Sequence, residues 1–301
     1  MHSATHVTRD LIEHVPGHSL IAKLLTEWDA GRIRLEGADG VVIDEESAGW
    51  FWGVLGERRV AEILARLPEG TTVLHSVPIG SQGADVDHLV VAPSGVYCIN
   101  TKFHACANVW TAGYGLTVNG ISHAKYLRAS AREAGRVEQK LSEAAGFAVP
   151  VYPVVAFVDA ARFTKTAPND IDGVRVFATT ADQILRLIDT RRELSDDQVA
   201  RIAEAARRPN TWLRTLRPTP PGAHLAREFD ALSAALAPAM SRRSAPKPAA
   251  RRESRIRGPK TTGQRVLVGV LGGCLIVLAL PWIGLLLMNL LGLVLGVVVG
   301  R

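Results

Sequence analysis

The sequence has few cysteines, and its start does not predict a secretory leader. Only three of its 301 residues are cysteine, namely Cys98, Cys106 and Cys274. They are too few and too widely spaced for the disulfide framework of a secreted domain, and a lone pair does not make a structural zinc site. The first ten residues are polar and no apolar stretch follows them, so we expect no signal peptide. Nothing in this pattern indicates an oxidising compartment.

Charge is absent from residues 266–300, a run of 35 residues. Apolar runs of about 18 residues or more are typical of membrane-spanning segments, whereas a buried core helix rarely needs such a length. A straight helix of this length would measure about 50 Å, against a hydrocarbon core of about 30 Å. Pro281 lies near its middle, and proline interrupts a helix. The sequence predicts a transmembrane helical hairpin or, slightly less favoured, one kinked transmembrane helix.

The net charge of +6 comes from one segment. From Arg242 to Arg265 there are nine Lys or Arg residues and one acid, whereas residues 1–240 carry 25 basic and 28 acidic side chains. A basic run beside a membrane segment keeps that side in the cytoplasm and attracts anionic lipids. We therefore expect the protein at the cell membrane, bound to lipid through its tail and basic linker, with its soluble domain facing the cytoplasm. A non-specific DNA-binding arm is a second interpretation of the same segment.

Composition divides the chain into four parts. A short amphipathic helix is expected at residues 18–28, and residues 216–265 are rich in Pro, Ala, Ser and Arg, with one possible helix at 224–236. The predicted boundaries are an N-terminal extension at 1–45, a folded domain at 46–215, a linker at 216–265 and the membrane segment at 266–300.

The folded domain shows alternating helix and strand patterns. Ser47 is a candidate N-cap for the first helix, and turn residues such as Pro93-Ser94-Gly95 separate the strands. The order predicts a mixed sheet with helices packed on it, an α/β fold. The expected elements are a helix at 47–67, strands at 72–78, 86–92 and 96–103, a hairpin at 109–118, a helix at 122–146, strands at 151–158 and 174–178, and helices at 180–189 and 195–207.

Three polar side chains lie in the strands that form the predicted hairpin. Asp87 is on one strand, and Asn100 and Lys102 are two positions apart on the next, so these two point to the same face. Carboxylate and amide oxygens bind Mg²⁺ or Mn²⁺, and an ammonium group positions or activates water. This set of groups is typical of metal-assisted phosphodiester hydrolysis.

These residues and their order resemble a known family. Gly56-Glu57, Asp87-His88, the run Ile99-Asn100-Thr101-Lys102 and the helix at 126–134 resemble the nuclease-related domain, NERD, over residues 53–158. That family is similar to restriction-endonuclease-like enzymes of the PD-(D/E)xK type. The resemblance implies an αβββαβ core, DNA as the substrate, and convergence of Glu57, Asp87, position 100 and Lys102, with Glu57, Asp87 and Asn100 as the metal ligands.

The chain departs from that family at Asn100, where the pattern has Glu or Asp. An amide oxygen is neutral, and hard cations bind largely through ligand charge, so metal affinity should fall. Asp85 or Glu57 would be the substitute ligand. Three functions therefore remain open: a membrane-tethered nuclease, a domain that kept the fold and binds nucleic acid or protein without catalysis, and a membrane-associated interaction protein.

Each site residue also has a purely structural interpretation. Glu57 next to two arginines would be a solvated surface charge, and Asp87 would be an ion-pair partner of Lys102, because an unpaired buried carboxylate is costly. The row Arg128, Arg132 and Arg136 would be a solvated helix face, or a contact for a phosphate backbone.

Overall fold

The computed structural model describes residues 10–37, 40–80, 84–188, 192–213 and 220–244. The chain divides into two units after Ser244, and all described residues belong to the first. No helix in these ranges is long and apolar enough to cross a membrane. The predicted membrane segment at 266–300 and the linker beyond residue 244 lie outside the described residues.

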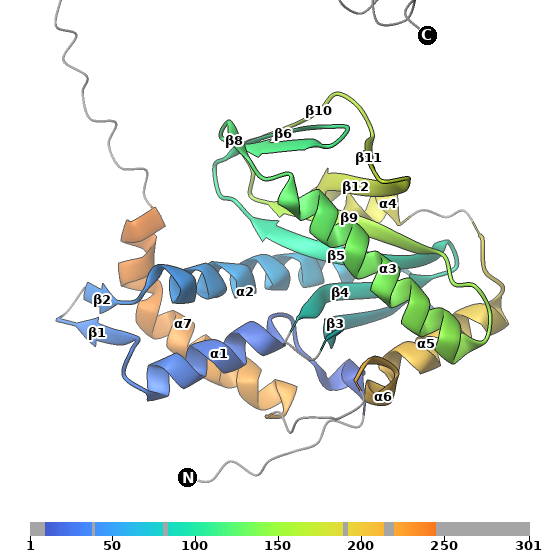
Figure 1. Cartoon of the computed structure of the whole chain (residues 1–301). Coiled ribbons are helices and arrows are strands. Elements are labelled where there is room, and N and C mark those ends of the chain that lie inside the picture. The colour runs from blue at the N-terminus through green and yellow to red at the C-terminus, as the bar shows by residue number, and fades with distance from the viewer. Residues whose placement is uncertain (1–9, 38–39, 81–83, 189–191, 214–219, 245–301) are drawn as a thin grey trace, which may run out of the picture. The chain divides into compact units, whose positions relative to one another are not determined.

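A six-stranded mixed sheet forms the centre of the first unit (Figure 1). Strands β3 (Thr72–Pro78), β4 (Asp85–Ala92) and β5 (Gly95–Phe103) are antiparallel neighbours. Strand β5 then pairs in parallel with β9 (Val151–Val158), which pairs in parallel with β12 (Val174–Thr180). The predicted α/β class with a mixed sheet is confirmed. From edge to edge the strands are β11 (Asn169–Ile171), β12, β9, β5, β4 and β3.

Helices cover both faces of this sheet. Side chains alternate along β4, so that Leu89 and Val91 pack toward one core and Val90 toward the other. The first core includes residues of α3 (Lys125–Ala145), α5 (Asp196–Arg207) and α6 (Pro209–Trp212). The second includes residues of α2 (Glu45–Leu64), the 3-10 turn η2 (Ala181–Gln183) and α4 (Ile184–Leu187). The order α2, β3, β4, β5, α3, β9 is the αβββαβ order expected from the sequence.

A small second sheet extends from the end of β5. The predicted hairpin is present as two antiparallel strands, and a strand from after β9 adds to it in parallel, which local sequence patterns did not indicate. Buried residues of this sheet, including Leu116, pack against Leu127 of α3 and Phe157 of β9. Its strands are β10 (Arg162–Lys165), β6 (Asn108–Ala112), β7 (Gly115–Val118) and β8 (Ile121–Ser122), in that order.

The N-terminal segment and the last described helix form a third core with α2. Figure 1 shows α1 (His18–Asp29) and α7 (Gly222–Ser244) beside α2, and Ile21, Phe51 and Phe229 are buried together there. Before and after α1 lie the 3-10 turn η1 (Leu11–Glu13) and the short strands β1 (Arg34–Glu36) and β2 (Gly40–Val42). The possible helix at 224–236 is therefore present and longer than expected, because its apolar side packs on α1 and α2 and is not solvated.

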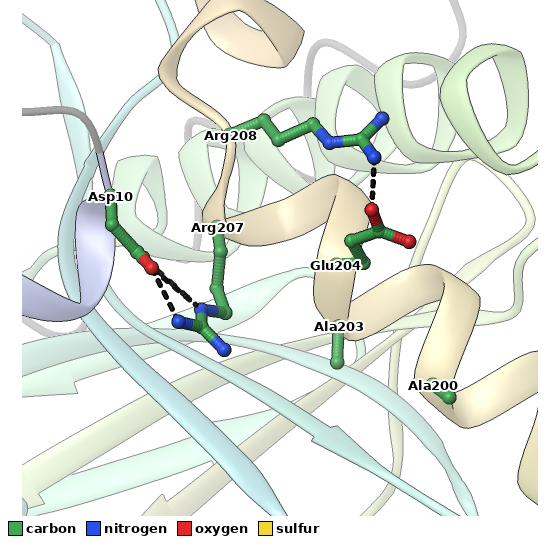
Figure 2. A pocket seen from close by; sticks show the side chains of 6 residues that line it. All are labelled: Asp10, Ala200, Ala203, Glu204, Arg207 and Arg208. Atoms are coloured by element: carbon green, nitrogen blue, oxygen red, sulfur yellow. Dashed lines mark hydrogen bonds and ion pairs between the residues drawn. The ribbon is translucent and has the colours of Figure 1, made fainter.

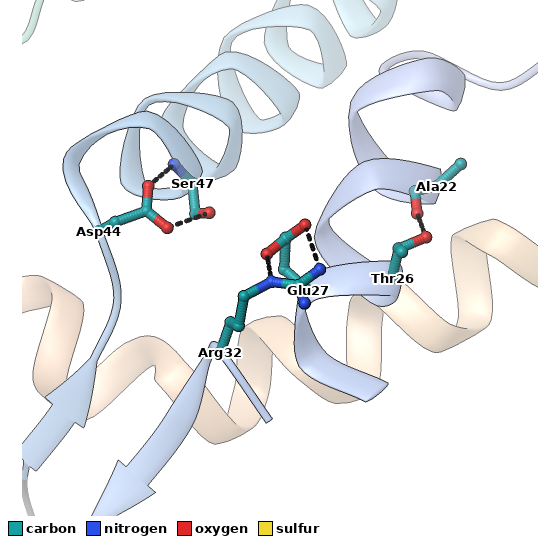
Figure 3. Close-up of polar contacts among 6 residues, drawn as sticks. All are labelled: Ala22, Thr26, Glu27, Arg32, Asp44 and Ser47. Atoms are coloured by element: carbon teal, nitrogen blue, oxygen red, sulfur yellow. Dashed lines mark hydrogen bonds and ion pairs between the residues drawn. The ribbon is translucent and has the colours of Figure 1, made fainter. Parts of the chain in front are cut away.

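Polar contacts fix the ends of α1 and α2 (Figure 3). The carboxylate of Asp44 accepts a hydrogen bond from the backbone N–H of Ser47 over 2.7 Å and another from its hydroxyl over 2.9 Å. Asp44 is therefore the N-cap of α2, three residues before the cap expected from the sequence. After α1, Arg32 forms an ion pair with Glu27.

Candidate functional site

The site is built where β4 begins and β5 ends. The two strands are antiparallel, with His88 opposite Ile99, so Asp87 lies next to Asn100 at the same end of the sheet. The Oδ2 atom of Asp87 accepts a hydrogen bond from the backbone N–H of Thr101 over 2.5 Å. This bond holds the Asp87 carboxylate against β5, within the group of residues predicted from the sequence.

Asn100 and Lys102 point to the same face of β5, as their spacing predicts. The ammonium group of Lys102 donates to Oδ1 of Asn100 and to the backbone oxygen of Thr101, the latter over 3.0 Å. It also lies 5.2 Å from the ring centre of Tyr126. In the described part of the chain no ion pair joins Lys102 to Asp87, so Lys102 is held by the strand that carries it and by α3.

A further carboxylate reaches this face from α3. The Nδ2 group of Asn100 donates a hydrogen bond to Oε2 of Glu133 over 2.8 Å. Glu133 lies beside the buried stripe of α3, between Ser130 and Val137, and is itself only partly exposed. Local sequence patterns do not predict this contact; the signal for Glu133 in the sequence is an acid next to the apolar stripe of an amphipathic helix.

Glu57 approaches from the opposite side of the sheet. A Cβ atom at Gly56 would lie 3.1 Å from Cβ of Phe103, so the glycine lets α2 come close to the end of β5. The carboxylate of Glu57 accepts a hydrogen bond from the backbone N–H of Gly17, the N-cap of α1, over 2.8 Å. Only 5% of Glu57 is exposed, so it is not the solvated surface charge that its arginine neighbours suggested.

Burial and mutual repulsion raise the pKa values of the acidic groups at this end of the sheet. Burial raises the pKa of Asp87 to about 7, with Lys102 opposing and Asp85 adding to the rise. Burial, then Asp87 and Asp85, raise the pKa of Glu57 well above its ordinary value. Burial also raises the pKa of Asp85 and of Glu133. Four carboxyl groups therefore lie close enough to influence one another, with Lys102 next to three of them and Lys23 near Asp85, and a cation or added protons would relieve their repulsion.

The oxygen donors fit a hard cation in type and charge. Carboxylates of Asp87 and Glu133 and the amide oxygen of Asn100 are the ligand types that Mg²⁺ and Mn²⁺ prefer. In the described ranges, however, no three His, Cys, Asp or Glu side chains are already gathered around one point. The ammonium group of Lys102 is bonded to the Asn100 amide oxygen. A cation would therefore have to displace Lys102 before it could use that oxygen.

His88 follows Asp87 in β4 and points to the other face of the sheet. His88 is fully buried, and its Nδ1 lies 2.8 Å from Nδ1 of His75, so it has an interior role. Cys98 is buried and Cys106 is exposed, both as free thiols.

A pocket of about 350 Å³ lies between η1 and α5 (Figure 2). In it Arg207 forms an ion pair with Asp10, and Arg208 forms one with Glu204. Its lining contains none of the predicted site residues.

Part of the chain matches the model of a protein family. No curated protein and no solved structure matches the chain. The matched region of the family comparison begins in α2 and ends with β9, and therefore contains Glu57, Asp87, Asn100, Lys102 and Glu133. Residues 52–158 match the family model of the nuclease-related domain, NERD.

Proposed function

We propose that the domain containing residues 52–158 hydrolyses DNA phosphodiester bonds with the help of Mg²⁺ or Mn²⁺, on a restriction-endonuclease-like core. The observation that carries the proposal is the meeting of Asp87, Asn100, Lys102 and Glu133 at one end of β4 and β5. Carboxylates can hold the cation of metal-assisted phosphoryl chemistry, and a lysine beside them can stabilise the negative charge on the phosphate. The match to the nuclease-related domain supports the same class of reaction.

In this proposal each side chain has a separate task. Asp87, with Asn100, Glu57 and Glu133, would hold the cation, which when bound polarises the phosphate oxygens. Lys102 would stabilise the negative charge that develops on the phosphate. Because Asn100 contributes no charge, we expect weak cation binding, and the nearby carboxylate of Glu133 partly replaces the acid that the family pattern has at position 100.

The test uses the full chain in neutral detergent and its Asp87→Asn variant. Mn²⁺ should raise the melting temperature of the parent and not that of the variant, and plasmid and single-stranded DNA should be cleaved only by the parent. Mg²⁺ should act in the same direction. The proposal would be contradicted if neither cation binds the parent and the parent does not cleave DNA.

A second candidate function is a binding domain without catalysis. It is favoured by the bonds of Asn100, whose amide group is already occupied by Lys102 and Glu133. Such a domain would bind DNA or a protein equally well in Mn²⁺ and in EDTA and would not cleave DNA. Catalysis by the parent that is lost in Lys102→Ala would exclude this alternative.

We also propose that residues 266–300 anchor the protein in the cell membrane, with the first unit and the basic residues from Arg242 to Arg265 in the cytoplasm. The support is the length of the uncharged run and the basic segment before it. The protein should sediment with membranes and resist extraction by high salt, because apolar insertion is not screened. Release by salt alone would show that only the basic segment binds lipid.

A further inference from the structure

A second group of side chains lies next to Lys102, where β5 ends and α3 begins. His104 follows β5 directly, and its ring centre is 5.8 Å from that of His123, which precedes α3. The ring of Tyr126 is 4.9 Å from that of His123, and its hydroxyl lies 3.4 Å from Nε2 of His104. Lys102 and Lys125 lie 5.2 and 6.0 Å from the Tyr126 ring centre. We call His104, His123, Lys125 and Tyr126 the α3-start cluster.

The backbone holds the α3-start cluster in place. The N–H of His104 donates to the carbonyl of Val158 in β9 over 3.2 Å, and the N–H of His123 donates to the carbonyl of Leu116 in β7 over 2.8 Å. The N–H of Tyr126 donates to the carbonyl of His123 over 2.9 Å. Both sheets and α3 therefore fix these side chains relative to Lys102.

The α3-start cluster is positively charged and incompletely bonded. The first turn of α3, a helix of 21 residues, contains no acid, and no side chain caps its N-terminus. The positive end of the helix dipole therefore adds to the charges of Lys102 and Lys125. The Nδ1 atom of His123 is buried and has no hydrogen-bond partner among the described residues. Since buried polar atoms are usually bonded, this nitrogen is free to bond a group that enters the cluster.

The basic surface continues from the cluster along α3. Arg128, Arg132 and Arg136 are exposed and four positions apart, so they form one row with steps of about 6 Å. Within the part of the chain that the structure describes, none of the three forms an ion pair. A row of exposed guanidinium groups that leads to Lys125 and the adjacent Lys102 is suited to a chain of phosphates.

We propose that the α3-start cluster binds a backbone phosphate of a nucleic-acid strand, next to the phosphodiester group held at Lys102, and that the arginine row of α3 follows the same strand. This inference takes from the proposed function only the class of substrate, a nucleic acid, and does not depend on catalysis. A nucleic-acid strand is favoured over a lipid headgroup because ring faces of Tyr126 and the histidines lie among the cations, and bases stack on such rings.

The test measures binding of a fluorescein-labelled single-stranded oligonucleotide to the full chain in neutral detergent with EDTA, at several salt concentrations. Lys125→Gln should weaken binding about three- to ten-fold at low salt and lower the slope of log affinity against log salt by about 0.7. Arg227→Gln is the matched control, because it removes one exposed charge from α7, and it should leave the slope unchanged.

His123→Phe separates a binding role from a structural one. The change keeps an aromatic ring and removes an unbonded buried nitrogen, so the melting temperature should stay the same or rise. Oligonucleotide binding should nevertheless weaken about three- to ten-fold, the effect of losing one or two hydrogen bonds. Unchanged binding by both His123→Phe and Lys125→Gln would overturn the inference.

Vesicles of phosphatidylglycerol distinguish the other source of phosphate. Binding to vesicles that is weakened by Lys125→Gln, without oligonucleotide binding by the parent, would overturn the inference in favour of a lipid site. Because all binding is measured in EDTA, a failure here is distinguishable from a failure of the proposed metal-dependent cleavage. An inactive protein that binds the oligonucleotide through the α3-start cluster would support the inference and contradict only the catalytic proposal.

Discussion

Asn100 on β5 donates a hydrogen bond from Nδ2 to the Glu133 carboxylate on α3 over 2.8 Å. At the same time its Oδ1 accepts from Lys102. A neutral amide can donate to one partner and accept from another, whereas a carboxylate can only accept. The residue that departs from the family pattern is therefore the one that joins the lysine of the site to an acid on α3.

The first prediction concerns restoring the missing charge. Asn100→Glu places a carboxylate beside Glu133 and removes the donor that Glu133 uses. Without metal, the variant should therefore lose about 1–3 kcal/mol of unfolding free energy and melt at a lower temperature than the parent. Mn²⁺ should bind more tightly than to the parent and should restore the lost stability, and any cleavage should rise. Calorimetric melting with metal titration checks this. Asn100→Glu that binds Mn²⁺ no better than the parent would argue against a metal site.

The second prediction is a pH dependence of stability in EDTA. The folded pKa of Asp87 is about 7, above its ordinary value of 3.8, so the folded state holds a proton that the unfolded state has lost. Stability from this group is complete below about pH 4 and is lost as the pH rises through 7. Each unit of pKa difference corresponds to about 1.4 kcal/mol of unfolding free energy. Because Asp87 is partly exposed, solvent screening makes its contribution smaller than the full pKa difference would give.

Asp87→Asn should remove this dependence, because an amide oxygen still accepts from Thr101 but does not titrate. Melting temperatures from pH 4 to 8 should therefore fall less steeply in this variant than in the parent. Glu138→Gln, an exposed change on α3, serves as the control and should follow the parent. Parallel profiles for the parent and Asp87→Asn would contradict the assignment.

The third prediction separates positioning from metal binding. Lys102→Ala removes the cation that lowers the pKa of Asp87 and frees Oδ1 of Asn100. The pKa of Asp87 should rise further, Mn²⁺ binding should persist, and the cleavage rate should fall about 100-fold or more, as for the loss of a charge-stabilising group. Isothermal titration beside single-turnover kinetics checks both parts. If Lys102→Ala loses Mn²⁺ binding as well as cleavage, Lys102 has a structural role.

The fourth prediction concerns the last described helix. Phe229 on α7 is fully buried, its ring centre lies 5.7 Å from that of Phe51 on α2, and Arg58 lies over its face at 4.6 Å. Phe229→Ala should therefore cost about 3–5 kcal/mol of unfolding free energy. Arg227→Ala, on the exposed side of the same helix, should change stability by less than about 0.5 kcal/mol. Denaturant unfolding of both variants measures the difference, and equal stabilities would show that α7 is not part of the core.

The sequence determined the elements whose signals are local. The strand over 72–78 and the strand over 151–158 have the predicted bounds, because β-branched apolar runs between turn residues are short-range patterns. The spacing of Asn100 and Lys102 likewise placed both on one face, since side chains alternate along a strand. The cap of α2 was misplaced at Ser47, because Asp44 and Ser47 are both capping residue types and only the backbone geometry distinguishes them.

Only the tertiary structure decided which distant residues meet. Glu133 is 33 positions from Asn100, and Gly17 is 40 positions from Glu57, so no local pattern predicts either contact. The same holds for α7, whose apolar side was hidden in a segment with linker composition until α1 and α2 provided a surface for it. Burial then set the pKa values of the carboxyl groups, because the cost of a charge depends on everything packed around it and not on its neighbours in the chain.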